Sequence, residues 1–245
     1  MRVPVWASDL ANRFWERAGA PSGFPRDLEA SIVVAHEVTI KRIANLNVAQ
    51  ARDWLASLRI AFDEAIDRPL RGCLAAHGEA GIILIDANDS PDEQRFTLAH
   101  EVAHFLRDHW RPRERVAHAI GVPAVEVVDG RRSATVEERF ASALEGVPLT
   151  VRMHLLPRDS KGQPTSAIAD AEDSADRLAF ELLAPAGHLA EQGAAKWSDC
   201  ELLNRLISTY GLPAREANHY AALLRPSEPQ VDDWIAALRA QCRVS

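Results

Sequence analysis

A chain of 245 residues, of which 47% are hydrophobic, is long enough to bury one substantial core or two small ones. The formal net charge of −7 argues against broad binding to nucleic acids, and no stretch approaches the roughly 18 continuous apolar residues that cross a membrane. The N-terminus has no apolar signal core, and the three cysteines show no CxxC spacing. We therefore expect a cytoplasmic protein without a membrane partner, direct nucleic-acid binding, a disulfide framework or a thiolate metal site.

The first third of the chain predicts helices followed by a β-hairpin. Capping and stop residues mark three helices: Ser8 and Gly19 bound the first, Asp27 begins the second, and Asn47 caps the third. Two apolar runs, 70–77 and 81–86, then flank a turn at Gly78. The strand 82–85 of this hairpin could align an extended peptide by pairing with it, provided that it lies at an edge of its sheet.

The next segment carries the pentapeptide His100-Glu101-Val102-Ala103-His104. Residues four apart lie one turn apart on the same face of a helix, so His100 and His104 can reach one metal ion. Glu101 points about 100° further round the helix, beside the place of an attacking water. Zinc peptidases of the HExxH kind use these parts: two nitrogen ligands, an open coordination position and a general base. The pentapeptide alone fits a surface helix with two solvated histidines equally well.

The helix around the pentapeptide is two-sided, which favours the metal site. Apolar residues cover about half of its circumference: Phe96, Leu98, Ala99, Val102, Ala103, Phe105 and Leu106. The remaining arc holds the polar residues: Thr97, His100, Glu101, His104 and Asp108. A helix that is buried on one side and gathers its ionisable groups on the other indicates the wall of a cleft rather than open surface.

A third ligand is offered by the helix predicted at 171–184, which ends before Pro185. Glu172 and Asp176 lie at the margin of its apolar stripe, where acids are costly unless a cation or donors meet them. In a zinc site Glu172 would be the third ligand and Asp176 would accept an imidazole N–H. The alternative is two acids that reach water at the helix edge. The outward side is expected to hold residues that pair in solvent: Asp173, Arg177 and Glu181.

A different third ligand, the histidine of the metzincin pattern HExxHxxGxxH, is excluded. That pattern needs glycine and histidine where this chain has Arg107 and Trp110. His109 misses the register by one residue and faces away from His104 by about half a turn.

Taken together, the two segments resemble the ImmA/IrrE family of metallopeptidases, whose zinc sites are thermolysin-like (gluzincin). The resemblance rests on 81–90 with 94–106, on the spacing Glu172-x-x-Ala175-Asp176, and more weakly on 206–217, which is similar to a helix-turn-helix-like closing segment. The resemblance implies Zn²⁺ as cofactor, with His100, His104 and Glu172 as ligands and Glu101 as catalytic base. The family cleaves or inactivates repressor-type transcription regulators in phage, mobile-element or stress regulation. A helix-turn-helix repressor or an antitoxin is therefore the implied protein partner.

The spacing departs from the family, because 68 positions separate His104 from Glu172. The added region 111–168 reads as a packed insert with a strand-like run at 125–128, a helical run at 136–144 and an apolar run at 147–156. We expect an α+β fold: a small antiparallel sheet packed on helices around the active-site helix, with this inserted subdomain and C-terminal helices.

The predicted organisation has four parts. The N-terminal part of the metallopeptidase domain covers 1–110, the insert covers 111–168, and the third-ligand and C-terminal helices cover 169–225. Within the last of these parts, helices are expected near 200–210 and 214–224. A terminal helix at 226–245 carries a docking stripe formed by Val231, Trp234, Ile235 and Leu238.

The predicted function is that of a zinc-dependent endopeptidase, with two alternatives. In the first, the same fold is a binding or sensor module that sequesters a repressor or antitoxin with little turnover. In the second, which the acidic charge disfavours, the helices of 206–224 bind DNA. No oxyanion-stabilising residue can be assigned, and four candidates stay open: Tyr210, Tyr220, His154 and His188.

Overall fold

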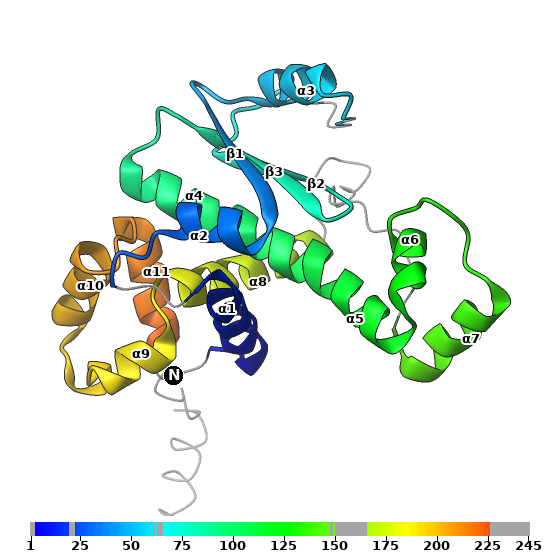
Figure 1. Cartoon of the computed structure of the whole chain (residues 1–245). Helices are drawn as coiled ribbons and strands as arrows, with labels where there is room; N and C mark the ends of the chain where they lie inside the picture. The colour runs from blue at the N-terminus through cyan, green and yellow to red at the C-terminus, as the bar shows by residue number, and fades with distance from the viewer. Residues whose placement is uncertain are drawn as a thin grey trace, which may run out of the picture.

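A computed structural model of the chain describes residues 3–19, 23–60, 62, 66–147, 149 and 166–225 (Figure 1). The predicted terminal helix at 226–245, His154 and most of the apolar run 147–156 lie outside the described residues. In the described part of the chain, no helix is long and apolar enough to cross a membrane. The α+β class is confirmed, since a small sheet lies against a long helix that carries the HExxH pentapeptide.

The elements follow one another in chain order. The N-terminal half contains α1 (Val5–Ala18), α2 (Leu28–Ala35), β1 (Glu37–Ile43), α3 (Val48–Ser57), β2 (Gly72–His77), β3 (Ala80–Asp86), α4 (Pro91–His104) and the π-helix η1 (Phe105–Trp110). The next region contains α5 (Arg111–Ala119), the 3₁₀ turn η2 (Val122–Ala124), α6 (Val125–Val128) and α7 (Val136–Glu145). The C-terminal part contains α8 (Ser166–Leu183), α9 (Ala186–Glu191), the 3₁₀ turn η3 (Ala194–Lys196), α10 (Asp199–Ser208) and α11 (Ala214–Leu224).

The sheet is mixed rather than antiparallel. Its order is β1-β3-β2, and β2 and β3 form the predicted hairpin, but β1 pairs with β3 in parallel. This strand was not predicted from the sequence. Its alternating apolar and polar residues follow the second helix almost directly, so no turn signal separates the two elements. A crossover that includes α3 lets β1 run parallel to β3. The same order corrects the expectation for 82–85, because β3 lies between two strands and cannot pair with a substrate.

Local sequence signals explain where the helices begin. Asp27 accepts a hydrogen bond from the Ala30 amide at the start of α2, and Asn47 does the same for α3 through the Gln50 amide. The first helix starts at Val5 rather than after Ser8, whose hydroxyl instead donates to Glu181 of α8. The side chain of Ser8 is therefore a tertiary contact and not a cap.

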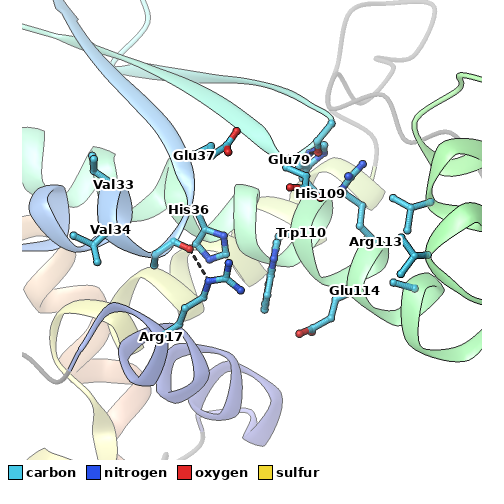
Figure 2. A pocket seen from close by; sticks show the side chains of 15 residues that line it. Arg17, Val33, Val34, His36, Glu37, Glu79, His109, Trp110, Arg113 and Glu114 are labelled. Carbon is cyan, nitrogen blue, oxygen red and sulfur yellow. Dashed lines mark hydrogen bonds between the residues drawn. The ribbon is translucent and has the colours of Figure 1, made fainter.

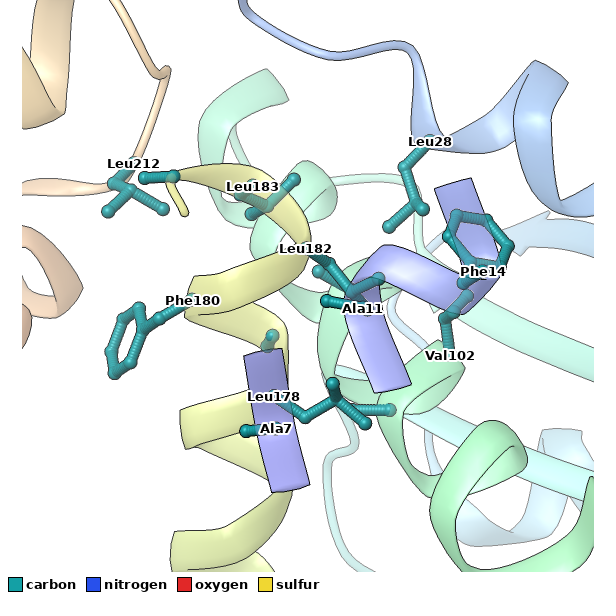
Figure 3. Close-up of a cluster of buried hydrophobic side chains, with 14 of the residues drawn as sticks. Ala7, Ala11, Phe14, Leu28, Val102, Leu178, Phe180, Leu182, Leu183 and Leu212 are labelled. Carbon is teal, nitrogen blue, oxygen red and sulfur yellow. The ribbon is translucent and has the colours of Figure 1, made fainter. Parts of the chain in front are cut away.

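The main core lies between α1, α4 and α8, as Figure 3 shows. Ala7, Ala11 and Phe14 of α1 meet Leu178 and other apolar residues of α8, while Val102 faces them from α4. Burial of these faces supplies the main stabilising free energy of the fold, at about 25 cal/mol per Å² of apolar surface. It also fixes the two helices that carry the predicted metal ligands against each other.

The region after η1 forms a small separate cluster. Val116, Ala124 and Val147 are buried together, and Figure 1 shows α5 continuing from α4 and carrying α6 and α7 away from the sheet. The predicted helix at 136–144 is present as α7, whereas the strand predicted at 125–128 is wrong, because these residues form the helical turn α6. Valine favours strands only where a neighbouring strand can pair with it, and the described residues offer none here.

Candidate metal centre

The helix α4 positions the pentapeptide. It starts at Ser90 and Pro91, where Glu93 reaches back to accept hydrogen bonds from the Ser90 amide (3.2 Å) and hydroxyl (2.9 Å). Ala99, Val102 and Ala103 are fully buried on its core side. The opposite side faces a cleft, as predicted. Phe96, predicted on the apolar side, also lines this cleft, and Thr97 and Glu101 of the polar side are buried at its wall.

The structure brings His100, His104 and Glu172 together. Nε2 of His100 lies 3.2 Å from Nε2 of His104 and 3.1 Å from Oε2 of Glu172. Nε2 of His104 lies 3.7 Å from Oε1 of Glu172. Among the described residues these three make up a group whose potential ligand atoms all lie within 4.8 Å of one another.

These separations suit a zinc ion. Ligand atoms about 2.0–2.1 Å from zinc at tetrahedral corners lie about 3.3 Å apart, which is close to the three separations found here. Two imidazoles and a carboxylate are also a donor set that zinc prefers. The three residues therefore fit a site for this metal, with room for a further ligand on the cleft side.

Two carboxylates orient the imidazoles so that Nε2 is the atom that faces the site. Asp176 lies 2.8 Å from Nδ1 of His100, in the position predicted for it from the sequence. Asp108 lies 3.0 Å from Nδ1 of His104. A carboxylate that accepts the Nδ1–H leaves the lone pair on Nε2 available to a metal. The role of Asp108 was not predicted, although its i, i+4 spacing from His104 was a signal for it.

The acids and imidazoles shift one another's pKa values. Burial lowers the pKa of His100, but its hydrogen bonds to Asp176 and Glu172 outweigh this effect and raise the pKa to about 10. Hydrogen bonds from both imidazoles hold the pKa of Glu172 well below its usual range. The pKa of Glu101 is raised, because burial disfavours its charged form more than the nearby imidazoles favour it. Negatively charged carboxylates thus surround the space between His100, His104 and Glu172, and the carboxyl group of Glu101 lies beside this space.

The site lies in a cleft of about 540 Å³ between β2 and the helices α4, α8 and α11. Its lining includes apolar residues from the α3–β2 region and α4: Val48, Phe62, Leu70, Leu74 and Phe96. Arginines also line it: Arg68, Arg71 and Arg215. Glu101 opens into this cleft with only 9% of its surface exposed.

Three of the predicted candidates for an oxyanion donor lie in the described part of the chain (Tyr210, Tyr220 and His188), and none of these three lines the cleft. Tyr220 is buried and donates to Glu181 and to the Ala184 carbonyl, and Tyr210 packs against Phe24. His188 likewise stacks on Phe24. His219 of α11 does line the cleft, with its ring 5.7 Å from that of Phe180.

The position of His219 could have been found from the sequence. Ala217, Tyr220 and Leu224 form the buried face of α11, and Arg215 and His219 are spaced i, i+4 beside that face. Both residues line the metal cleft. Glu216, between them on α11, lines it as well.

The prediction for the outward side of α8 is half right. Arg177 pairs with Asp173 at 2.7 Å on the surface. Glu181, in contrast, is only 2% exposed and accepts hydrogen bonds from the Ser8 hydroxyl, the Ala186 amide and the Tyr220 hydroxyl. Burial of this acid is possible because three donors replace water around its carboxylate.

A second pocket, shown in Figure 2, lies between the start of β1 and α5. Its lining includes His36, Glu37, Glu79, Trp110 and Arg113. His36 is 7% exposed, and its ring contacts the rings of Phe14, Phe105 and Trp110. Within the described residues this pocket holds no group with the spacing of metal ligands.

Comparison with known proteins supports a metallopeptidase family for part of the chain. Residues 64–144 match the family model of the IrrE N-terminal-like domain, Peptidase_M78. The matched part contains His100, Glu101 and His104 and ends before Glu172. No curated protein and no solved structure matches the chain. Residues 64–144, with the pentapeptide at the wall of a cleft, therefore belong to the Peptidase_M78 family of IrrE N-terminal-like domains.

Proposed function

We propose that the protein is a zinc-dependent endopeptidase that hydrolyses a peptide bond in a protein substrate. The observation that carries this proposal is the convergence of His100, His104 and Glu172, with Glu101 buried beside them in an open cleft. Family membership of residues 64–144 supports a metallopeptidase. A metal-binding module without turnover would not require a buried carboxylate at the position of Glu101.

The residues of the chain divide the chemistry among them. His100, His104 and Glu172 would hold a zinc ion, which would supply a Lewis acid for the peptide carbonyl. Glu101 accepts a proton from the attacking water and returns it to the departing amine.

The edge strand β2 aligns the substrate in this proposal. The sheet order places β2 at an edge, and residues 70–74, at its start, line the cleft beside His100. An extended peptide that pairs with this edge would pass the metal ligands with its backbone held by hydrogen bonds. This role replaces the one expected for β3, which lies between its two neighbours.

A repressor-type transcription regulator or an antitoxin is the proposed substrate class. Its support is the resemblance to the ImmA/IrrE family in the segments that contain the zinc ligands. The acidic protein would meet such basic DNA-binding partners with favourable charge.

Cleavage of candidate repressors by the wild type and by Glu101→Gln tests the proposal. We expect the variant to bind zinc as the wild type does and to lose at least about 10³-fold in kcat. Glu216→Gln is the matched control, because it makes the same change in the same cleft and should keep most of the activity. Equal release of a repressor from DNA by the wild type and Glu101→Gln, without cleavage by either, would favour the sequestering module instead.

A further inference from the structure

The side chain of Arg107, which lies near the cleft, makes three hydrogen bonds. Its Nε donates to Oδ1 of Asp108 at 2.8 Å and one terminal nitrogen donates to Oδ2 at 2.7 Å. The other terminal nitrogen donates to the Ala171 carbonyl at 2.7 Å. The side chain is only 14% exposed. One guanidinium thus joins the helix η1 to the helix α8.

The first partner of Arg107 is the carboxylate that orients His104. Asp108 accepts from Nδ1 of His104 at 3.0 Å, so its position determines which way Nε2 points. A two-pronged contact between guanidinium and carboxylate fixes the plane of the acid as well as its charge.

The second partner of Arg107 immediately precedes Glu172. The Glu172 side chain is 54% exposed, and the contacts that hold it are those to His100 and His104. Packing therefore does little to restrain this ligand. A hydrogen bond to the backbone one residue earlier can restrain it, because it fixes the early part of α8 relative to η1.

We propose that Arg107 is a positioning residue that preorganises the metal site. It closes a loop of contacts that runs from His104 through Asp108 and Arg107 to Ala171 and back through Glu172. The loop spans the two segments that are 64 positions apart in the chain, from Arg107 to Ala171. This inference rests on the proposed metal site and adds a residue that no ligand motif includes.

Lysine cannot replace arginine in this role. The three bonds leave from a planar group whose nitrogens point in fixed directions, whereas an ammonium is a single point on a flexible stem. A lysine at this position would keep the charge beside Asp108 or the contact to Ala171, but not both. The conservative change is therefore a sharper test than removal of the charge.

The test measures zinc affinity by competition with a chelator for the wild type, Arg107→Lys, Arg107→Met and Arg177→Met. We expect zinc binding to weaken about 10–100-fold in Arg107→Met and several-fold in Arg107→Lys. Arg177→Met is the matched control, because Arg177 lies on α8 and its bond is to the surface acid Asp173. It should bind zinc within about twofold of the wild type.

Hydrogen exchange of the metal-free proteins distinguishes the contact of Arg107 with Asp108 from its contact with the Ala171 carbonyl. Backbone amides in 168–176 should exchange faster in Arg107→Met than in the wild type or Arg177→Met. Asp108→Asn should weaken zinc binding but leave this exchange unchanged, since the bond to Ala171 remains.

The outcomes distinguish the inference from the proposed function. Wild-type zinc affinity together with wild-type exchange in Arg107→Met would overturn the inference and leave the metal site intact. Absence of zinc binding by the wild type would remove the proposed function, and the exchange of the metal-free proteins would still decide whether Arg107 holds α8. Should Arg107→Met fail to fold, Arg107→Lys supplies both measurements.

Discussion

Gly72, the first residue of the edge strand β2, lies against Thr97 and Glu101 of α4. A Cβ atom at this position would lie 2.6 Å from Cγ2 of Thr97, 3.1 Å from the Leu84 carbonyl oxygen and 3.2 Å from Oε1 of Glu101. Real side chains do not approach so closely, and Thr97 is itself buried. The absence of a side chain at residue 72 is thus what lets the carboxylate of Glu101 and β2 share one wall of the cleft.

Gly72→Ala should therefore displace Glu101 and its neighbours. We expect a loss of about 1–3 kcal/mol in the free energy of unfolding and a drop in kcat that exceeds the change in KM. Denaturant unfolding and steady-state kinetics measure the two effects. Adding Thr97→Ser, which removes the crowded methyl group, should restore part of both.

Gly187→Ala is the control for this substitution. Nothing lies within 4 Å of a Cβ at Gly187, which is in α9. Stability should rise or stay level there, because alanine restricts the unfolded chain. Equal effects of the two alanines would show that close packing at Gly72 is unimportant.

His36, in the second pocket, makes stability depend on pH (Figure 2). Burial, assisted by the charge on Arg17, lowers the pKa of His36 to about 4 from 6.5. The folded protein keeps His36 neutral while the unfolded chain takes up a proton below about pH 6.5, so the unfolded state binds more protons. The free energy of unfolding should therefore fall by up to about 3 kcal/mol more in the wild type than in His36→Gln as pH decreases from 6.5 to 4. Urea unfolding of the wild type and His36→Gln between pH 6.5 and 4 measures this difference. Equal pH dependence of the two free energies of unfolding would refute a neutral, buried His36.

At the scale of elements, the buried carboxylate of Glu181 joins four helices. It lies on α8 and accepts from Ser8 of α1, from the amide of Ala186 in α9 and from Tyr220 of α11. Tyr220 is adjacent in sequence to His219, which lines the cleft. The carboxylate therefore holds the wall of the cleft that α11 contributes against the helix that carries Glu172.

Glu181→Gln should weaken this junction. The amide offers one accepting oxygen where the carboxylate offers two, so at least one buried donor loses its partner, at a cost of about 1–3 kcal/mol. Glu191→Gln, an exposed change in α9, should cost less than about 0.5 kcal/mol. A double-mutant cycle with Tyr220→Phe should show non-additive free energies of unfolding. Additive values would mean that the hydrogen bond between the two side chains contributes little.

The sequence predicted those elements whose own residues determine them. The helix of the pentapeptide and α8 show a clear apolar stripe, and the hairpin has a glycine turn, so these elements are present as expected. β1 and α6 were missed or misassigned, because whether a short apolar run is a strand depends on a partner that is distant in sequence. The same reason applies to Glu181, since its periodicity gave no sign of the donors that Ser8 and Tyr220 supply.

At the scale of the whole molecule, the candidate site depends on a contact between distant parts of the chain. Its two imidazoles come from α4 and its carboxylate from α8, and the buried faces of these helices form one core with α1 (Figure 3). The spacing within α4 could be read from five residues. The approach of Glu172 was inferred from its place beside an apolar stripe and from the resemblance to the ImmA/IrrE family. The spacing of Asp108 from His104 was a signal for their contact, whereas the contacts of Arg107 required the folded geometry. Packing of the core thus brings together ligands that no local motif contains.

Metal binding should consequently stabilise the whole fold. A ligand that binds only the folded state adds RT ln(1 + [L]/Kd) to the free energy of unfolding, which is about 2.7 kcal/mol at a hundredfold excess over Kd. For a protein of this size that free energy raises Tm by about 5–10 °C. Thermal unfolding with zinc and after removal of zinc by a chelator measures the shift.

The ligand variants decide whether this stabilisation comes from the three predicted residues. Glu172→Gln should retain the Tm of the metal-free wild type within a few degrees, because Glu172 is exposed, but should respond little to zinc. Asp173→Gln, at the next position of the same helix, should respond as fully as the wild type, since Asp173 contacts Arg177 on the outer surface. A zinc response that survives Glu172→Gln would place the metal elsewhere in the molecule. In that case the packing of α4 against α8 would serve the hydrophobic core and not a metal site.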